Sequence, residues 1–161
     1  MNRAIAFAAL CLFAVPCLGR DSYQSVECKK FTRAEGVEVS PEFPDFLYAA
    51  LRAELQKAKL FKEILSEGEV VDSASEAQSV VVEGSLVHFK KGSVIKESLI
   101  GFGSGRRSLK ASFTAHRRSN REKLLDRDLQ VKTSSRMNEK LLARSLAKKI
   151  VKEMKEGLKL K

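Results

Sequence analysis

The chain has 161 residues, and its 30 lysines and arginines against 20 aspartates and glutamates give a net charge of +10. Hydrophobic residues make up 43% and charged residues 31%, which is ordinary for one globular domain and excludes a collagen-like, low-complexity or largely disordered chain. Three cysteines are too few for a disulfide scaffold, and 7% aromatic residues without tryptophan argue against a surface of stacked aromatic rings.

The first nineteen residues have the layout of a secretory signal peptide. After an early arginine, residues 4–15 form an unbroken apolar run, which is shorter than the roughly 20 apolar residues that a spanning helix needs. Cys17 and Gly19 place small residues just before a cut after Gly19. An uncleaved membrane anchor is the alternative. We predict a signal peptide at residues 1–19 and a single α+β envelope domain at residues 20–161.

A lipid anchor is a minority hypothesis for this segment. A lipidated cysteine follows a small residue in bacterial lipoproteins, whereas Pro16 precedes Cys17 and a leucine precedes the other leader cysteine. The predicted location is therefore the periplasm or the outer membrane surface, without a lipid anchor. Cys28 would be the only thiol left after cleavage. We predict that Cys28 is buried as a small strand residue; a free thiol or a bond to another chain are the alternatives.

The positive charge is concentrated in the last third of the chain. Residues 20–105 carry 11 basic and 14 acidic residues, whereas residues 106–161 carry 18 basic and 6 acidic ones. This asymmetry favours an anionic partner. In an exported protein that partner would be phospholipid head groups, lipopolysaccharide or another acidic polymer, and no nucleic acid is expected. The alternative is a solvated basic surface that binds nothing.

The first half of the domain combines short strands with one helix. A first strand is predicted within residues 23–31. Apolar residues at spacings of three and four then predict an amphipathic helix from Ser40, its capping residue, to about Leu60. Residues 80–90 form the best strand, because they begin with three β-branched valines. A bulge predicted at Gly84 would place Val80, Val82, Val87 and Phe89 on one buried face.

The second half is predicted to be a hairpin followed by a helix. Apolar and polar residues alternate over residues 109–116 and again over 125–132, as in half-buried strands. Asn120 between them tolerates the left-handed conformation that a tight turn needs. Ser135 or Asn138 is expected to cap a final helix whose apolar residues recur every four positions. We interpret this stripe as core, although a basic amphipathic helix lying on a membrane shows the same pattern.

A run of alternate glycines, Gly101-Phe102-Gly103-Ser104-Gly105, is the most distinctive local motif. It resembles a phosphate cradle, but the strand-glycine-helix order and the Gly-Lys-Ser/Thr signature of nucleotide loops are missing. A tight entry to the next strand is the simpler interpretation, and an anion held by the loop amides and two arginines is the functional alternative. The candidate partner-binding or anion-binding residues are Gly101, Phe102, Gly103, Gly105, Arg106 and Arg107, together with Lys148 and Lys152 on the basic face of the last helix.

The sequence contains no catalytic constellation. His88 and His116 are the only histidines; His88 has no cysteine or carboxylate at metal-ligand spacing, and His116 falls on the polar face of its strand, where we expect it to be exposed. The acidic neighbours Glu67, Glu69 and Asp72 are interpreted as a solvated loop. We therefore predict no enzyme activity, no cofactor and no metal, and we identify no small-molecule substrate.

Three segments of the chain together resemble a bacterial family. They are Leu60–Ile64, residues 81–89 with their Glu-Gly pair, and the glycine motif before a hairpin and a terminal helix. This family is catalogued as domain of unknown function 4410, and the similarity spans roughly residues 25–158. The resemblance implies an exported, often lipid-anchored protein without established enzyme activity, folded as a small α+β envelope domain. The sequence departs from the family in lacking a good lipidation site, in having Asn120 where a turn glycine is usual, and in residues 134–137, which replace a glycine-rich acidic approach to the last helix.

The predicted fold is α+β, with a small, mainly antiparallel sheet of about four to five strands and two amphipathic helices packed on one face. The predicted function is that of a non-enzymatic exported accessory or binding module of the bacterial cell envelope, with an envelope protein as its partner. The alternative is a peripheral protein that binds anionic lipid or lipopolysaccharide through its basic C-terminal third. A weaker alternative is an enzyme that uses the Gly101–Gly105 loop.

Overall fold

The computed structural model describes residues 23–93 and 106–160. The predicted signal peptide, and the glycine motif up to Gly105, lie outside the described residues. No helix in the described ranges is long and apolar enough to cross a membrane. In chain order the elements are β1 (Ser25–Cys28), β2 (Thr32–Arg33), α1 (Phe43–Ala58), β3 (Glu63–Leu65), α2 (Ser73–Ala77), β4 (Ser79–Lys90), β5 (Arg107–Arg117), β6 (Lys123–Thr133) and α4 (Glu139–Gly157).

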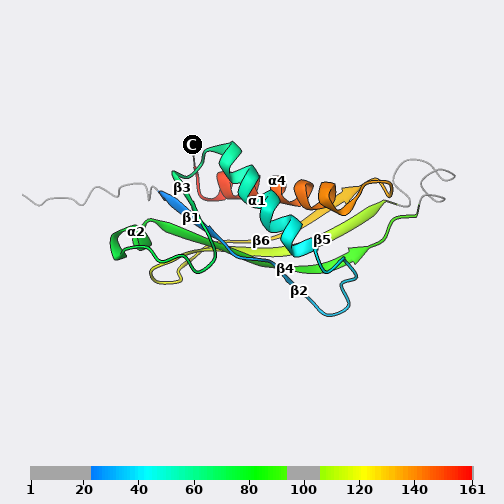
Figure 1. The fold of residues 1–161 in the computed structure, drawn as a ribbon, viewed down its shortest axis with the longest axis horizontal. Coiled ribbons are helices and arrows are strands. Elements are labelled where there is room, and N and C mark those ends of the chain that lie inside the picture. Colours follow the sequence, from blue (N-terminus) through cyan, green and yellow to red (C-terminus); the bar gives the residue numbers. More distant parts are fainter. Residues whose placement is uncertain (1–22, 94–105, 161) are drawn as a thin grey trace, which may run out of the picture.

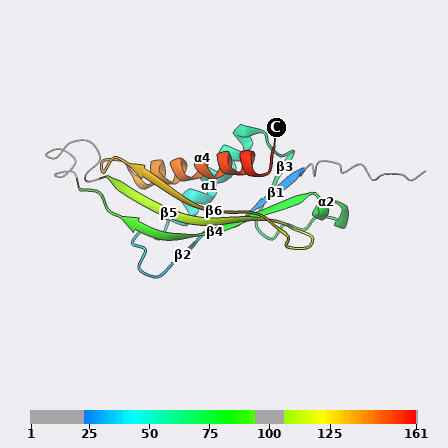
Figure 2. The same ribbon diagram turned by 180° about the vertical axis from the view of Figure 1, so that it is seen from behind.

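Six strands form one open sheet in the order β3-β1-β4-β5-β6, and β2 pairs with β4 beyond the end of β1. The long strands β4, β5 and β6 are antiparallel neighbours, whereas β1 is parallel to both β3 and β4. The α+β class is confirmed, and α1 and α4 lie on the same side of the sheet (Figures 1 and 2). The predicted four to five strands were too few, because β2 and β3 have only two and three residues, too short for an alternating pattern to show.

The core lies between the sheet and the two long helices. The apolar stripe of α4 is sealed against the other layers, since Leu142, Leu146, Ile150 and Met154 are 0% exposed. Burying one such side chain contributes about 1.5–3 kcal/mol. The interpretation of this stripe as core is confirmed. The apolar face of α4 is therefore not free to lie on a membrane.

The predicted start is correct for α4 and wrong for α1. The Asn138 side-chain oxygen accepts a hydrogen bond from the Leu141 N–H at 2.9 Å, as a helix cap should. In α1 the capping position is Glu42, which makes no side-chain cap bond, and the helix begins at Phe43 rather than after Ser40. Phe43 is completely buried, so its packing in the core, rather than the capping residue, sets where α1 begins.

The β5–β6 turn differs in detail from its prediction. Arg121, not Asn120, takes the left-handed conformation, with φ 57°. The Asn120 side-chain oxygen instead accepts a hydrogen bond from the Glu122 N–H at 3.0 Å. Asparagine side chains form such local bonds to the backbone two residues ahead, which stabilises turns. The residue type was recognised correctly, but its role in the turn was not.

The predicted bulge at Gly84 is wrong. Gly84 pairs regularly with Phe113, and the irregularity falls between Leu86 and His88. Val87 is therefore the extra residue, and it is 48% exposed rather than buried. Gly84 is required for another reason: a Cβ atom there would lie 2.4 Å from both a ring carbon of Phe31 and the main-chain oxygen of Ser112. The glycine lets the Phe31 ring close directly over the backbone of β4.

We expect Gly84→Ala to destabilise the fold by about 1–3 kcal/mol, because the added methyl group overlaps an aromatic ring and a backbone oxygen that cannot both move away. Urea denaturation followed by circular dichroism measures the effect. Ser85→Ala, one residue along on the opposite face, is the matched control and should change the free energy of unfolding by less than about 0.5 kcal/mol. Equal stability of the two variants would show that Phe31 does not pack on Gly84 this way.

Candidate functional site

Within the described part of the chain, no helix covers the face of β4, β5 and β6 opposite α1 and α4 (Figure 2). Successive residues of a strand point to opposite faces, so the residues between the core positions of β4, β5 and β6 line up here in cross-strand rows. Of the fifteen residues in these five rows, Val81 alone is apolar. The rows are Val81–His116–Lys123, Glu83–Thr114–Asp126, Ser85–Ser112–Asp128, His88–Lys110–Gln130 and Lys90–Ser108–Lys132. We call this surface the open face.

Two adjoining hollows, of about 440 and 220 Å³, lie on the open face. Lys29, Glu83 and Thr114 border both of them. The lining of the larger hollow includes four residues with hydroxyl groups, which can both donate and accept hydrogen bonds. The larger hollow is also lined by Lys30, Thr32, Glu67, Gly84, Ser85, Ser112 and Phe113, and the smaller one by His116, Arg121 and Lys123.

Ion pairs form the boundary between the two hollows. Lys29 Nζ lies 3.1 Å from one carboxylate oxygen of Glu83, and His116 Nδ1 lies 3.8 Å from the other. The side chains of Lys29 and Glu83 are 36% and 43% exposed. A half-exposed pair of this kind contributes only about 0–1 kcal/mol. A charged group of a ligand can therefore replace Lys29 or Glu83 in this ion pair at little energetic cost.

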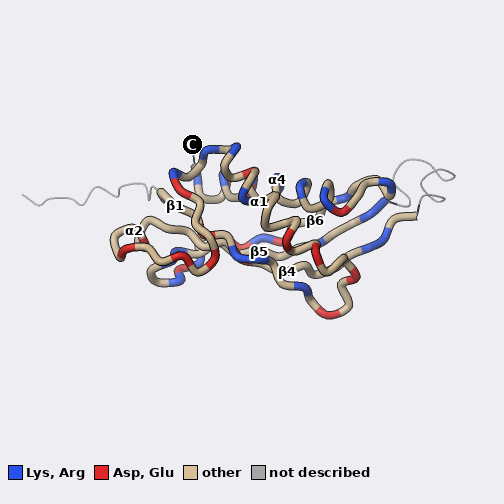
Figure 3. The backbone as a smooth tube through the Cα atoms, viewed as in Figure 1, with Lys and Arg blue, Asp and Glu red and all other residues tan. Residues whose placement is uncertain are grey.

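Charge is distributed unevenly along the molecule (Figure 3). Basic residues gather at the end where β5 and α4 begin, with the acidic residues of the segment after β2 nearby, and at the other end the acidic residues around α2 lie beside the basic residues of the β5–β6 turn. The described residues hold no group of three or more His, Cys, Asp or Glu that could hold a metal ion. The arrangement on the open face is thus one of hydroxyl groups and exchangeable charges, which suits binding.

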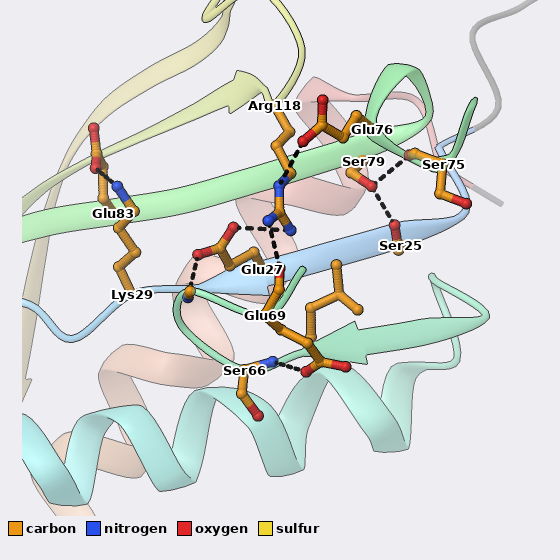
Figure 4. A network of polar contacts seen from close by, with 12 residues as sticks. Ser25, Glu27, Lys29, Ser66, Glu69, Ser75, Glu76, Ser79, Glu83 and Arg118 are labelled. Atoms are coloured by element: carbon orange, nitrogen blue, oxygen red, sulfur yellow. Dashed lines mark hydrogen bonds and ion pairs between the residues drawn. The ribbon is translucent and has the colours of Figure 1, made fainter. Parts of the chain in front are cut away.

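A buried network around Arg118 holds the end of the open face nearest α2 (Figure 4). Arg118 Nη1 lies 3.2 Å from Glu27 Oε2, with the two side chains 15% and 6% exposed. The other oxygen of Glu27 accepts a hydrogen bond from the Gly68 N–H at 2.9 Å, and the Arg118 side chain also donates to the Glu69 carbonyl. The network joins β1, the segment before α2 and the β5–β6 turn, so its role is to fix this end of the fold.

Cys28 is buried in the core, and its predicted burial as a strand residue is confirmed. Burial raises the pKa of the Cys28 thiol from its ordinary value of 9.0 to about 12. The thiolate is the reactive form of cysteine, so this thiol is unreactive near neutral pH. Cys28 therefore takes no part in the open face, although it directly precedes Lys29.

The structure separates the candidate residues that the sequence grouped. Gly101, Phe102, Gly103 and Gly105 lie outside the described residues. Arg106 and Arg107 lie at the beginning of β5, where Arg107 Nη1 donates a hydrogen bond to the Met137 carbonyl at 2.7 Å. Lys148 and Lys152 are exposed on the far side of α4, where Lys152 Nζ lies 3.8 Å from Glu156. Lys148 is about 15 Å along the helix from Asn138, so the two groups form no single site.

The sequence predicted the residues that β5 contributes to the open face, but not those that reach it from β1. The alternation of β5 correctly placed Ser112, Thr114 and His116 on its polar side. It gave no sign of Lys29, because pairing of β1 with β4 joins residues 54 positions apart, such as Ser25 and Ser79. Arg118 was expected only as a turn residue, and its burial depends on the same distant pairing.

Comparison with known proteins identifies the family. The model of the domain of unknown function DUF4410 matches residues 31–122. The chain belongs to the DUF4410 family. The match confirms the resemblance drawn from the sequence but spans less than the expected residues 25–158, since it excludes β1, β6 and α4. No curated protein matches the chain.

Several solved structures share the fold of this DUF4410 member at low sequence identity. A PelC dodecamer from Paraburkholderia phytofirmans is 11% identical, with 81% of this chain and 86% of that chain covered and a TM-score of 0.57. Protein XCC0632 from Xanthomonas campestris, of family DUF330, is 10% identical, with 84% and 85% covered and a TM-score of 0.54. The hypothetical protein CT253 from Chlamydia trachomatis is 8% identical, with 84% and 98% covered and a TM-score of 0.52. These similarities establish the fold alone.

We expect Arg118→Met to destabilise the protein by about 3 kcal/mol, because it leaves the buried Glu27 carboxylate without its counter-charge. Adding Glu27→Gln should recover part of the loss, since the two changes act on one interaction. Lys123→Met, in the same hairpin but with a side chain 62% exposed, is the control and should cost less than about 0.5 kcal/mol. Additive effects of the first two substitutions, measured by urea denaturation, would contradict a coupled pair.

Above pH 9 the raised pKa of Cys28 should lower the stability of the fold. The unfolded chain loses the thiol proton near pH 9, whereas the folded chain keeps it until about pH 12, so deprotonation favours the unfolded state across this interval. The free energy of unfolding should fall there by up to about 1.4 kcal/mol per pH unit. Cys28→Ala should lack this component of the slope. An identical slope in both proteins would show that the thiol is not protected by burial.

Proposed function

We propose that this protein is a non-enzymatic binding module of the bacterial cell envelope that docks an envelope protein on its open face. The observation that carries the proposal is the open face itself: five polar rows with two adjoining hollows, on a sheet whose other face is sealed by α1 and α4. Residues 1–19, with the layout of a signal peptide, support export to the envelope.

The composition of the larger hollow indicates the kind of partner. Its lining combines four hydroxyl side chains with two lysines and two glutamates, so the local charge is balanced. A partner that inserts an acidic side chain can pair with Lys29, and a basic one can pair with Glu83, in each case by replacing an exposed ion pair. Such a polar, exchangeable surface fits a reversible association rather than an obligate one, whose interface would be more apolar.

Among the described residues, the side chains that could act as a nucleophile or a general base are poorly placed for catalysis. The Cys28 thiol is buried and its pKa is raised to about 12. His116 faces Glu83, but this carboxylate is shared with the Lys29 ammonium group. These observations favour binding over catalysis. The glycine-loop enzyme alternative concerns residues outside the described ranges and is not part of the proposal.

Site-directed photo-cross-linking in living bacteria tests the proposed docking face. A photoreactive phenylalanine analogue at Ser112, in the lining of the larger hollow, should give a discrete adduct with an envelope protein. The same analogue at Lys148, exposed on α4, should give none. Glu83→Lys, which reverses one charge of the boundary between the hollows, should reduce the Ser112 adduct several-fold while leaving the far-ultraviolet circular dichroism spectrum unchanged.

Two outcomes would count against docking on the open face. One is the absence of any adduct at Ser112, and the other is an equal yield at Ser112 and Lys148. Because PelC, a protein of similar fold, is a dodecamer in its crystal structure, an adduct between two copies of this chain must be distinguished by its mass. Such an adduct would replace the envelope protein by a second copy as the partner of the open face.

A further inference from the structure

One end of the described fold carries exposed cations without an acidic partner among the described residues. Here β4 and β6 end while β5 and α4 begin, so Lys90 and Lys132 flank Ser108 in the last cross-strand row. Arg106 precedes β5 and Arg136 precedes α4, and all four basic side chains belong to exposed residues. Among the described residues, no carboxylate lies within ion-pair distance of any of the four. We call this end, with Met137 and Leu141, the strand-end tip.

Some cations of α4 have acidic partners. Arg144 Nε lies 3.1 Å from Glu54 and Lys152 Nζ lies 3.8 Å from Glu156. Lys149 donates a hydrogen bond to the Gln130 carbonyl at 3.1 Å. Other lysines of α4, such as Lys148 and Lys155, are exposed and have no ion pair with a described carboxylate. Positive charge alone therefore does not distinguish the strand-end tip from α4, and the distinguishing feature is what lies beside the cations of the tip.

Exposed apolar side chains stand beside these cations. Met137 and Leu141 are 37% and 42% exposed, and they are two of the four large hydrophobic residues exposed in the described part of the chain. The Arg107 guanidinium holds this segment by donating to the Met137 carbonyl. Cations that flank exposed apolar side chains are the features with which peripheral proteins bind a bilayer, because the charges attract acidic head groups while the apolar groups enter the interface.

We propose that the strand-end tip docks on the surface of an anionic phospholipid bilayer. Arg106, Lys132 and Arg136 would pair with head-group phosphates, and Met137 and Leu141 would enter the interface between head groups and acyl chains. The proposal rests on the envelope location proposed above. It places the tip on the membrane and the opposite end, with α2, away from it (Figure 1). The open face then stands beside the membrane, free for its partner.

Vesicle flotation with two charge-matched variants tests the docking site. The protein isolated from the cell envelope is mixed with phosphatidylcholine vesicles that contain about 30% phosphatidylglycerol. The tip variant carries Arg106→Glu, Lys132→Glu and Arg136→Glu, and the control carries Lys148→Glu, Lys152→Glu and Lys155→Glu, so both lose the same net charge. The tip variant should bind more than about tenfold more weakly than the control, since each basic residue near the surface contributes measurably.

Equal loss in the two variants would overturn the proposal, because binding would then follow net charge alone. Unchanged binding of the tip variant would overturn it as well. Neither result bears on the Ser112 adduct, so a failure of membrane docking is distinguishable from a failure of the proposed partner site. Binding of the wild-type protein should also weaken between about 0.05 and 0.5 M salt, as surface charge attraction is screened.

A second pair of variants separates a bilayer from a soluble polyanion. Met137→Asp should weaken vesicle binding several-fold, whereas Val70→Asp should not, because Val70 is 91% exposed in the segment between β3 and α2, away from the tip. Both residues are exposed, so circular dichroism melts of the two variants should match that of the wild type. If Met137→Asp binds vesicles as well as Val70→Asp, and soluble polyphosphate competes fully, the tip is a polyanion site and the bilayer proposal fails.

Discussion

The fold depends on burying two helical stripes against a single face of one sheet. Phe43, Leu47, Leu51 and Leu55 of α1 and the four-residue repeat of α4 are sealed against that face. Because successive strand residues point to opposite sides, this one-sided burial places the alternate positions of β4, β5 and β6 on the other face, where most of them are partly or fully exposed. The polar rows of the open face are thus the direct counterpart of the core. No third layer covers them within the described residues.

One-sided packing also separates the molecule's possible contacts in space. The apolar stripe of α4 is used internally, so the helix presents mainly polar and basic side chains to solvent, with Leu141 in its first turn as the exposed apolar exception. The cations that stand beside exposed apolar side chains lie at one end of the sheet, and the two hollows lie on its face. An end and a face can be occupied at the same time. This arrangement suits a small module that is held at one surface while it presents another.

Features that arise within one segment were predictable, and features that depend on distant pairing were not. The periodicity of α4, the alternation of β5 and the Asn138 cap are local, and the structure confirms them. The role of Gly84 was missed because Phe31, which closes over it, lies 53 positions earlier in the chain. The start of α1 was missed because burial of Phe43 overrides the capping preference of Ser40. Lys29 and Arg118 take their positions through the pairing of β1 with distant strands, which no local sequence pattern indicates.

The place of β1 in the sheet has a consequence for how the chain folds. This strand of four residues sits between β3 and β4, both of which follow it by many residues. It cannot take its place until the chain has been made beyond residue 82, and contacts of such high sequence separation slow folding. A fragment limited to residues 31–122 would lack this internal strand, β6 and α4, so we expect that the matched segment does not fold on its own. The sheet therefore closes only once β4 is available, and β1 joins the fold late.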